Sequence, residues 1–507
     1  MSGSIESRRH APVHTTVLVA GGGPAGATAA HLLAAAGFEV TLLERATFPR
    51  YHIGESLQPS CLAILDRVGM RETMLARGFV KKYGVYNDWG SERWAFEFAT
   101  IPGGEPHAFQ VLRSEFDELL LDNARQAGVT VFEGADVLGL DWEGDRPVRA
   151  HWRSTTDDDK AERVISFDWL IDASGRTGLI ANQYLKNRRF NEGFQNIAVW
   201  AYWKGAQPLG SDGPQGATAI SSVSNGWLWA IPLHDGTLSL GLVAHREEFK
   251  KRRADSPDLV ELYLKAVAES PLGSRLVAGA ERVGDLRLEQ DFSYAATSFS
   301  GPGYFLVGDA ACFIDPLLST GVHLAMYSAL LAAATTASVL RGEVTEDDGV
   351  RFYERSYRQA YLRILVLVAS FYQLYDGKDA YFWKAQQLAN EDLKGAADNA
   401  AFISIVAGRE DTRDAADPSR ALTRKVGGLV RDVFTMLSDE DRNEKLAAMS
   451  PEELSALLEQ GVELLNYTTG GFSVSPEDAV SNLYVAPSPA LGLLRSEAEV
   501  AAEVVGA

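Results

Sequence analysis

The 507-residue chain has little cysteine, no long apolar run and no excess of positive charge. Its two cysteines, Cys61 and Cys312, are too few for a disulfide framework or a cysteine-rich zinc site, so we expect no resident metal. No apolar run reaches the ~20 residues of a membrane span, and residues 1–14 lack the apolar core of a signal peptide. The net charge of −20 disfavours nucleic-acid and anionic-membrane partners. These absences predict a soluble, cytoplasmic protein.

What the sequence does contain is typical of a globular protein. The fraction of hydrophobic residues is 46% and that of charged residues is 23%, and the length allows two to four domains. The negative charge is uneven, because residues 431–507 carry 14 acidic and 4 basic side chains. Helix-start patterns in that stretch predict an acidic helical extension, and a partly disordered acidic tail is the alternative.

A glycine-rich turn near the N-terminus indicates dinucleotide binding. Gly21, Gly23 and Gly26 lie between a predicted strand, 15–20, and a predicted helix, 27–36. The first glycine permits a tight turn, the second lets a pyrophosphate approach the backbone, and the third lets helix and strand pack closely. Glu44 ends the next predicted strand, where a carboxylate can accept the ribose hydroxyls of adenosine.

Two further segments favour a flavin dinucleotide over a nicotinamide one. Arg113 opens a helix with the pattern RxxFD, and Gly308 with Asp309 follows a predicted buried strand. In the order GxGxxG, acidic strand end, RxxFD, DASG at 172–175 and GD, these segments resemble the aromatic-hydroxylase class of FAD-dependent monooxygenases. The resemblance spans about residues 14–340 and ranks FAD above NAD.

The segment 227–232 (WLWAIP) narrows the family. Trp227 and Trp229 are two residues apart, so they share one face of a predicted strand. With the flavin segments, this pattern resembles the signature of flavin-dependent halogenases. The likeness covers about residues 14–405 and includes three more segments: 49–56 (PRYHIGES), 78–84 around Lys82, and 315–321 (DPLLSTG).

The resemblance implies an α/β fold: a Rossmann-like FAD-binding domain of the aromatic-hydroxylase type, an antiparallel-sheet substrate domain and a helical C-terminal extension. Period-two alternation between about 190 and 289 supports the sheet domain. The expected divisions are a tail at 1–13, the FAD-binding domain at 14–185 and 290–345, the sheet domain at 186–289, a helical region at 346–430 and the acidic extension at 431–507.

In that family, reduced FAD and O2 oxidise chloride or bromide to hypohalous acid, which halogenates an electron-rich ring in secondary metabolism. The resemblance implies that Trp227 and Trp229 separate the organic substrate from the flavin and that Lys82 holds the hypohalous acid. The backbone N–H groups of Ser319, Thr320 and Gly321, at a helix start, suit chloride. A separate flavin reductase supplies reduced FAD.

The same resemblance implies a set of FAD-binding positions. They are Gly21, Gly23, Pro24, Ala25, Gly26, Glu44, Arg45, Arg50, Ile53, Gly54, Glu55, Ser56, Arg113, Asp172, Gly308, Asp309, Pro316, Gly321 and Val322. Asp291 is a candidate for covalent attachment of the flavin, and a loop aspartate that caps a turn is the alternative.

One departure from the family bears on the substrate. Tryptophan halogenases carry a glutamate immediately before Ser-Thr-Gly, and Leu318 takes that place here. An apolar residue can neither stabilise charge nor accept the ring proton, which predicts a phenolic or pyrrolic substrate, free or tethered to a carrier protein. A basic run at 250–253 (KKRR) is a candidate docking patch for an acidic carrier. The alternative function is an FAD-dependent aromatic hydroxylase.

Overall fold

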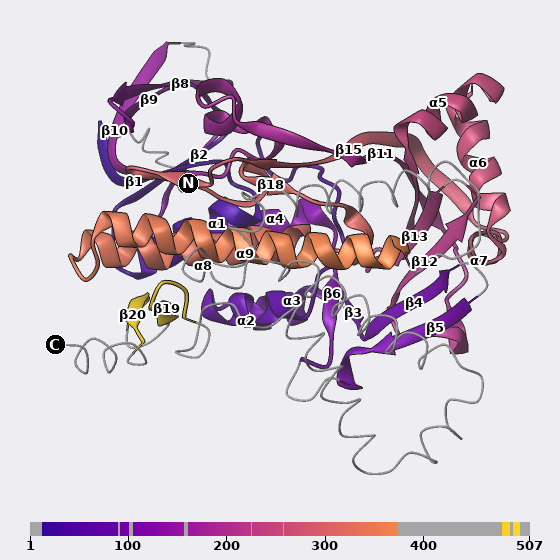
Figure 1. The fold of residues 1–507 in the computed structure, drawn as a ribbon. Coiled ribbons are helices and arrows are strands. Elements are labelled where there is room, and N and C mark those ends of the chain that lie inside the picture. Colours follow the sequence, from indigo (N-terminus) through magenta and orange to yellow (C-terminus); the bar gives the residue numbers. More distant parts are fainter. Residues whose placement is uncertain are drawn as a thin grey trace, which may run out of the picture.

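A computed structural model gives the fold of most of the chain. It describes residues 13–373 apart from 90–91, 101–104, 157–160, 225 and 257, together with residues 479–486 and 490–496. Two eight-stranded sheets stand next to each other, with long helices against the first and short helices against the second (Figure 1).

The first sheet is built on the βαβ opening that the sequence predicts. Its strands run in the order β16 (Ser300–Gly301), β17 (Tyr304–Leu306), β10 (Glu162–Asp172), β1 (His14–Ala20), β2 (Val40–Glu44) and β7 (Thr130–Glu133). Neighbours from β17 to β7 are parallel. The antiparallel pair β8 (Ala135–Glu143) and β9 (Arg146–Ser154) extends from β10. Because β1 lies between β10 and β2, the glycine turn that follows it opens at the carboxyl edge of the sheet.

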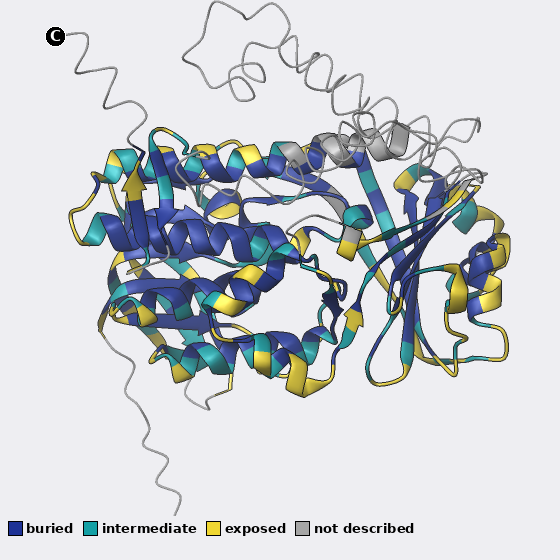
Figure 2. Ribbon diagram, turned by 90° about the horizontal axis from the view of Figure 1, so that it is seen from below, coloured by how far each residue is buried: buried dark blue, intermediate teal, exposed yellow. Residues whose placement is uncertain are grey.

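Helices pack against this sheet and against one another. They are α1 (Pro24–Ala35), α2 (Ser60–Arg67), α3 (Arg71–Arg77), α4 (Arg113–Gln126), α8 (Gly321–Leu340) and α9 (Glu346–Gln373). By length and composition α8 is apolar enough to cross a membrane, but 94% of its apolar window is buried. It packs on α1, α2 and α9, and Figure 2 shows it almost wholly as buried ribbon, so it is a core helix.

The second sheet is mainly antiparallel. Its strand order is β18 (Cys312–Phe313), β15 (Glu281–Ala296), β11 (Arg188–Lys204), β14 (Thr237–His245), β13 (Gly226–Pro232), β12 (Thr218–Val223), β4 (Gly84–Trp89) and β5 (Glu92–Glu97). The helices α5 (Arg246–Asp255), α6 (Leu259–Glu269) and α7 (Pro271–Leu276) lie on its outer side in Figure 1.

Alternation along β13 divides its side chains between two cores. Trp227 and Trp229 belong to the core shared with the first sheet, whereas Leu228 and Ala230 belong to the core under α5–α7. A strand shows its successive residues to opposite faces, so the spacing of the two tryptophans aims both at the first sheet. The short pair β3 (Val80–Lys82) and β6 (Ala108–Gln110) also lies at this junction.

The structure divides the chain differently from the predicted boundaries. The boundary expected at residues 289–290 falls inside β15, which stays paired with β11 up to its last residue. Strands β4 and β5, expected in the FAD-binding domain, belong to the second sheet. In the expected acidic helical extension, the described residues form a hairpin, β19 (Leu483–Ala486) and β20 (Gly492–Arg495), against α8. The rest of that extension and residues 374–430 lie outside the described residues.

Candidate functional site

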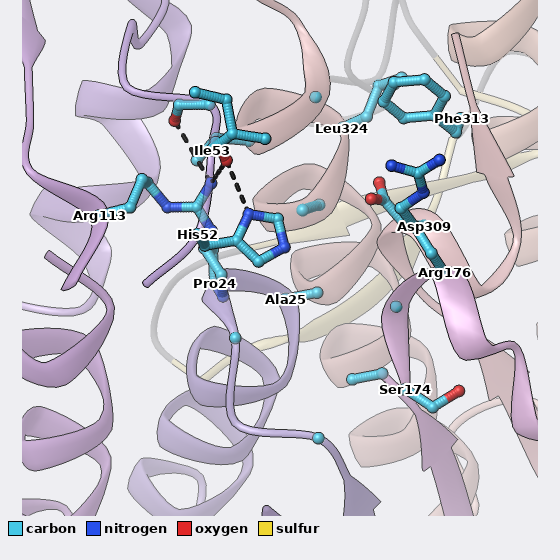
Figure 3. Close-up of a pocket in the computed structure, with 18 of the residues that line it drawn as sticks. Pro24, Ala25, His52, Ile53, Arg113, Ser174, Arg176, Asp309, Phe313 and Leu324 are labelled. Carbon is cyan, nitrogen blue, oxygen red and sulfur yellow. Dashed lines mark hydrogen bonds between the residues drawn. The ribbon is translucent and has the colours of Figure 1, made fainter. Parts of the chain in front are cut away.

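A cavity of about 530 Å³ lies where the glycine turn, α8 and the second sheet meet. Most of the predicted site residues line it. These are Gly21, Gly23, Pro24, Ala25, Glu44, Arg45, Arg50, Ile53, Gly54, Glu55, Ser56, Arg113, Trp227, Trp229, Asp309, Pro316, Ser319, Thr320, Gly321 and Val322. Figure 3 shows the loop that carries His52 and Ile53 on one side of it and Asp309 with Arg176 on the other.

The three glycines each serve a different geometric need. Gly21 has a φ of +113°, and a Cβ there would overlap the carbonyl of Ala173. A Cβ on Gly26 would overlap the carbonyl oxygen of Gly21, so helix and strand are packed too closely for a side chain. Gly23 is different, because its Cβ would meet only Nη2 of Arg50, at 3.2 Å. Its open side faces the cavity and leaves room for a ligand to approach the backbone.

The carboxylate of Glu44 is fixed at the end of β2 by backbone donors. Its Oε2 accepts from Gly22 N at 2.6 Å and its Oε1 from Ala46 N at 2.7 Å. Each oxygen keeps a further lone pair, so this carboxylate can still accept a hydrogen bond from a hydroxyl group of a ligand in the cavity. The position fits the ribose contact that the sequence predicts.

The loop 49–56 is held by the RxxFD segment. Arg113 donates twice to the carboxylate of Asp117, at 2.7 and 2.9 Å, and its Nη1 donates to the carbonyl of Ile53 at 2.7 Å. Arg50 also faces Asp117, with Nη1 and Oδ2 3.2 Å apart. Asp117 is fully buried, so this pair of cations balances it. Arg113 therefore fixes the loop, a role that the sequence did not predict for it.

His52 is placed by the same loop to accept a hydrogen bond from the cavity. Its Nδ1 is 2.6 Å from the carbonyl of Ile53, and since a carbonyl only accepts, Nδ1 carries the proton. Burial and the nearby Arg113 lower the pKa of His52 to about 4. The imidazole is thus neutral near pH 7, and its Nε2 is an acceptor.

Asp309 and Arg176 lie in the opposite wall of the cavity (Figure 3). Asp309 follows β17, and burial raises its pKa against the attraction of Arg176 and Arg113. Asp172 ends β10, and its two carboxylate oxygens accept from the backbone N–H groups of Ser174 and Ile180. Asp172 therefore shapes the turn, while Ser174 and Arg176 line the cavity. Gly308 directly precedes Asp309 and has a φ of +55°, a left-handed backbone conformation that favours glycine.

Trp227 and Trp229 form an aromatic wall of the cavity. Their ring centroids are 6.2 Å apart, and Trp200 lies 6.1 Å beyond Trp229. The Nε1 of Trp229 donates to Ser239 at 3.2 Å, and its ring lies over Gly241 so closely that a Cβ there would overlap it. The wall is rigid, apolar and without a nucleophile.

The segment 315–321 makes a tight turn into α8. Asp315 caps the backbone N–H of Leu317 at 2.9 Å, and Ser319 is left-handed with a φ of +54°. Helix α8 begins at Gly321 without a side-chain cap, and the space beside Gly321 is open. Thr320 and Gly321 line the cavity, so the uncapped N–H groups at the start of α8 suit an anion there.

Lys82 lies directly behind the cavity wall. Its Nζ is buried and donates to Ser56 Oγ at 2.9 Å and to the carbonyl of Leu57 at 3.2 Å. Ser56 lines the cavity, and its hydroxyl is 2.9 Å from that of Thr218. Burial lowers the pKa of Lys82 to about 7. The amine is thus available at neutral pH, one hydroxyl away from the cavity.

The residues that line the cavity fit FAD. The glycine turn, the helix start of α1 and Arg50 suit a pyrophosphate, Glu44 suits a ribose, and Asp309 suits a ribityl chain. In the described part of the chain no cluster of three or more His, Cys, Asp or Glu side chains could hold a metal ion. Asp291 lies in β15 opposite Asn196 rather than in a loop.

Comparison with known proteins decides the family. The family model described as tryptophan halogenase matches residues 16–106 and 101–413. The chain belongs to this family of flavin-dependent halogenases. A tryptophan 2-halogenase from Chondromyces crocatus is 44% identical over 512 residues, covering 97% of this chain and 96% of the relative. A sulochrin halogenase from Aspergillus terreus is 40% identical over 420 residues, or 76% of each chain.

Solved structures agree with these relatives. This chain resembles the myxobacterial chondrochloren halogenase with a TM-score of 0.70 and 35% identity, over 79% of this chain and 91% of that one. A flavin-dependent brominase matches with a TM-score of 0.65 and 26% identity, over 83% and 99%. The halogenase is therefore an FAD-dependent oxidoreductase that uses O2 and a halide to halogenate an aromatic ring, and the hydroxylase alternative falls away.

The sequence left several cavity residues unassigned. Tyr51, Arg176 and Phe313 line the cavity, and Asp117 and Tyr202 support it from behind. The role of Asp117 could have been predicted from the sequence, because an Arg and an Asp four residues apart on a helix can form an ion pair. Tyr202 had only its alternation with Trp200 as a signal, since the strand pairing that brings it to Glu55 is long-range.

Proposed function

We propose that this halogenase acts on a phenolic or pyrrolic ring, free or tethered to a carrier protein in the cytoplasm, with hypohalous acid held by Lys82. When bound, reduced FAD with O2 and halide supplies that acid. The Lys82 ammonium carries the proposal: it has two acceptors for its three N–H groups within the described residues, so one can donate to an incoming oxygen. When Lys82 is the neutral amine, its Nζ can instead take up the halogen.

The surrounding residues restrict what reaches that lysine. We infer that Trp227 and Trp229 keep an organic ring out of the flavin cavity, because they fill its wall without offering a reactive atom. The halide is assigned to the start of α8, where the N–H groups beyond Ser319 have no side-chain cap.

The residue before Ser319 supports a phenol or pyrrole. Leu318 packs against the apolar core, and its carbonyl accepts from Gln58 Nε2. It cannot stabilise positive charge on a ring during halogenation, so the ring must stabilise that charge itself, as a phenol or pyrrole does. The Chondromyces relative is named for tryptophan, which makes free tryptophan the competing substrate.

Three of the four basic side chains in the predicted carrier-docking patch form ion pairs with glutamates. On α5, Lys250 pairs with Glu247 at 2.8 Å and Lys251 with Glu248 at 3.1 Å. Arg252 pairs with a glutamate of α6 at 3.1 Å. These ion pairs weaken the attraction that 250–253 offers to an acidic carrier, so a tethered substrate would gain little affinity from this patch alone.

The test is a product-mass screen with FAD, a flavin reductase and chloride or bromide. Free and carrier-bound tyrosyl, hydroxybenzoyl and pyrrolyl compounds are compared with free tryptophan. We expect a halogen isotope pattern on a phenol or pyrrole. Halogenation of tryptophan alone would contradict the substrate assignment, and the Lys82→Ala variant should bind FAD and give no halogenated product.

A further inference from the structure

A line of hydrogen-bonded side chains joins the cavity to its exposed rim. Glu55 lines the cavity and is 2% exposed. The hydroxyl of Tyr202 donates to its Oε1 at 2.7 Å, and the hydroxyl of Tyr51 lies 3.0 Å from that of Tyr202. Tyr51 is 42% exposed. Two tyrosine hydroxyls thus connect a buried carboxyl group with solvent.

The line has one direction when Glu55 is ionised. The indole Nε1 of Trp200 donates to the hydroxyl of Tyr51 at 2.8 Å, and an indole N–H can only donate. When Glu55 is a carboxylate, the single hydroxyl proton of Tyr202 is donated to it, so Tyr51 is the donor in the contact between the two tyrosines. Every donor points inward, which is the order needed to deliver a proton to Glu55.

Three charged side chains from different parts of the fold surround this line. Arg113 of α4 attracts the Glu55 carboxylate, whereas Asp235, in the turn between β13 and β14, repels it. Arg287 of β15 lies 3.5 Å over the ring of Tyr51. Burial raises the pKa of Glu55 to about 7 against the hydrogen bond from Tyr202 on β11. The carboxyl group can therefore gain and lose a proton near neutral pH.

Halogenation requires such a proton. Reduced FAD, O2, a halide ion and an aromatic C–H give the aryl halide, oxidised FAD and two waters only when one proton is also consumed. The carbon–halogen bond replaces the C–H bond, both oxygen atoms leave as water, and the negative charge of the halide is cancelled by the proton. Each turnover must therefore bring one proton from solvent into a site walled by tryptophans.

We propose that Tyr51 and Tyr202 deliver this proton and that Glu55 is the group that passes it to the reaction. The carboxyl group releases its proton into the cavity, takes one from the Tyr202 hydroxyl, and that hydroxyl is reprotonated through Tyr51 from solvent. Nothing in this role depends on which ring is halogenated, so it stands apart from the substrate proposal.

The test compares Tyr202→Phe and Tyr51→Phe with Tyr263→Phe. Tyr263 is also buried and hydrogen-bonded, to Trp203, but it lies on the opposite side of the sheet. We expect the two path variants to lose about 10-fold or more of kcat at pH 8, to recover at pH 6, and to keep the FAD Kd of the parent. Tyr263→Phe should keep the parental pH profile.

Three results would overturn the path. They are parental rates and pH profiles in both path variants, an equal loss in Tyr263→Phe, or a loss of FAD affinity that parallels the loss of rate.

A second experiment needs neither flavin nor substrate and measures the Tm of the apoprotein as a function of pH. Because the folded-state pKa of Glu55 is raised, its carboxyl group lowers stability progressively as pH rises from about 5 through 7. Glu55→Gln should flatten that part of the curve, and an unchanged curve would contradict the proposal.

Discussion

The ammonium of Lys82 reaches the hydroxyl of Ser56 across 2.9 Å in a fully buried setting. Ser56 belongs to the cavity wall, and its hydroxyl also meets Thr218 at 2.9 Å. The lysine is therefore coupled to the cavity by hydroxyl groups while its charge stays desolvated. This relationship explains both its low pKa, about 7, and its potential chemistry.

Replacing Lys82 by methionine should abolish halogenation and stabilise the fold near neutral pH. Because the folded-state pKa of Lys82 lies below its value in the unfolded chain, the buried ammonium destabilises the fold most at low pH, and the cost disappears as pH rises from about 7 to 10.5. Lys82→Met removes that cost, so we expect a Tm higher by on the order of 2 °C at pH 7.

The matched control is Lys81→Met, since Lys81 is the exposed neighbour on the same strand. Scanning calorimetry at several pH values and product mass give the two readouts. A Lys82→Met variant that still halogenates would remove the lysine from the mechanism.

Alanine at Gly23 and at Gly26 should separate cofactor binding from folding. The Cβ at Gly23 meets only the flexible end of Arg50, so Gly23→Ala should fold normally and lose FAD affinity, because the methyl group enters the space for the pyrophosphate. Gly26→Ala should unfold at a lower temperature, since its Cβ overlaps the carbonyl of Gly21. Flavin fluorescence titration and apoprotein Tm test both. A parental FAD Kd in Gly23→Ala would contradict this placement of the cofactor.

Much of the site was predictable because its signals are local. The turn at Gly21–Gly26, the strand end at Glu44 and the tryptophan pair each depend on residues close together in the sequence. Period-two spacing put Trp227 and Trp229 on one face, and the structure shows which core that face joins.

The remainder depends on long-range pairing that a single sequence does not reveal. Tyr202 meets Glu55 only because β11 crosses beside the loop 49–56, 147 positions away. Likewise, β4 pairs with β12, more than 130 residues later, so the domain boundary expected before residue 186 does not hold for it. In the acidic extension, helix-start patterns gave no sign that 483–495 would pair as a hairpin against α8.

Adding one methyl group at Gly241 should disturb the tryptophan wall. The Cβ of Gly241→Ala would overlap the ring of Trp229, which must then tilt into the cavity or displace β14. We expect less halogenated product for each reduced FAD consumed and more hydrogen peroxide. Gly273→Ala is the control, because its Cβ would meet the side chain of Leu228, on the opposite face of β13, at 3.1 Å. Equal peroxide release by Gly241→Ala and the parent would show that the position of this ring does not matter.

Neutralising Asp117 should loosen the loop 49–56. The carboxylate balances Arg113 and Arg50 in a fully buried position, so Asp117→Asn leaves a buried cation uncompensated and should cost about 3–5 kcal/mol of unfolding free energy. Asp122→Asn on the same helix breaks only the surface pair with Arg125 and should cost about 1 kcal/mol or less. Urea unfolding measures both, and equal costs would contradict the buried-pair argument.

The variant Leu318→Glu tests whether this position determines which aromatic ring the enzyme prefers. The side chain directly precedes Ser319, where the tryptophan halogenases that the sequence resembles carry a glutamate. We expect Leu318→Glu to raise the ratio of kcat/KM for tryptophan to that for a phenol by about 10-fold, since a carboxylate there can stabilise the charge on the indole. Leu318→Gln, which matches the shape without the charge, should leave the ratio unchanged. An equal rise in both variants would show that polarity or shape, and not charge, sets the preference.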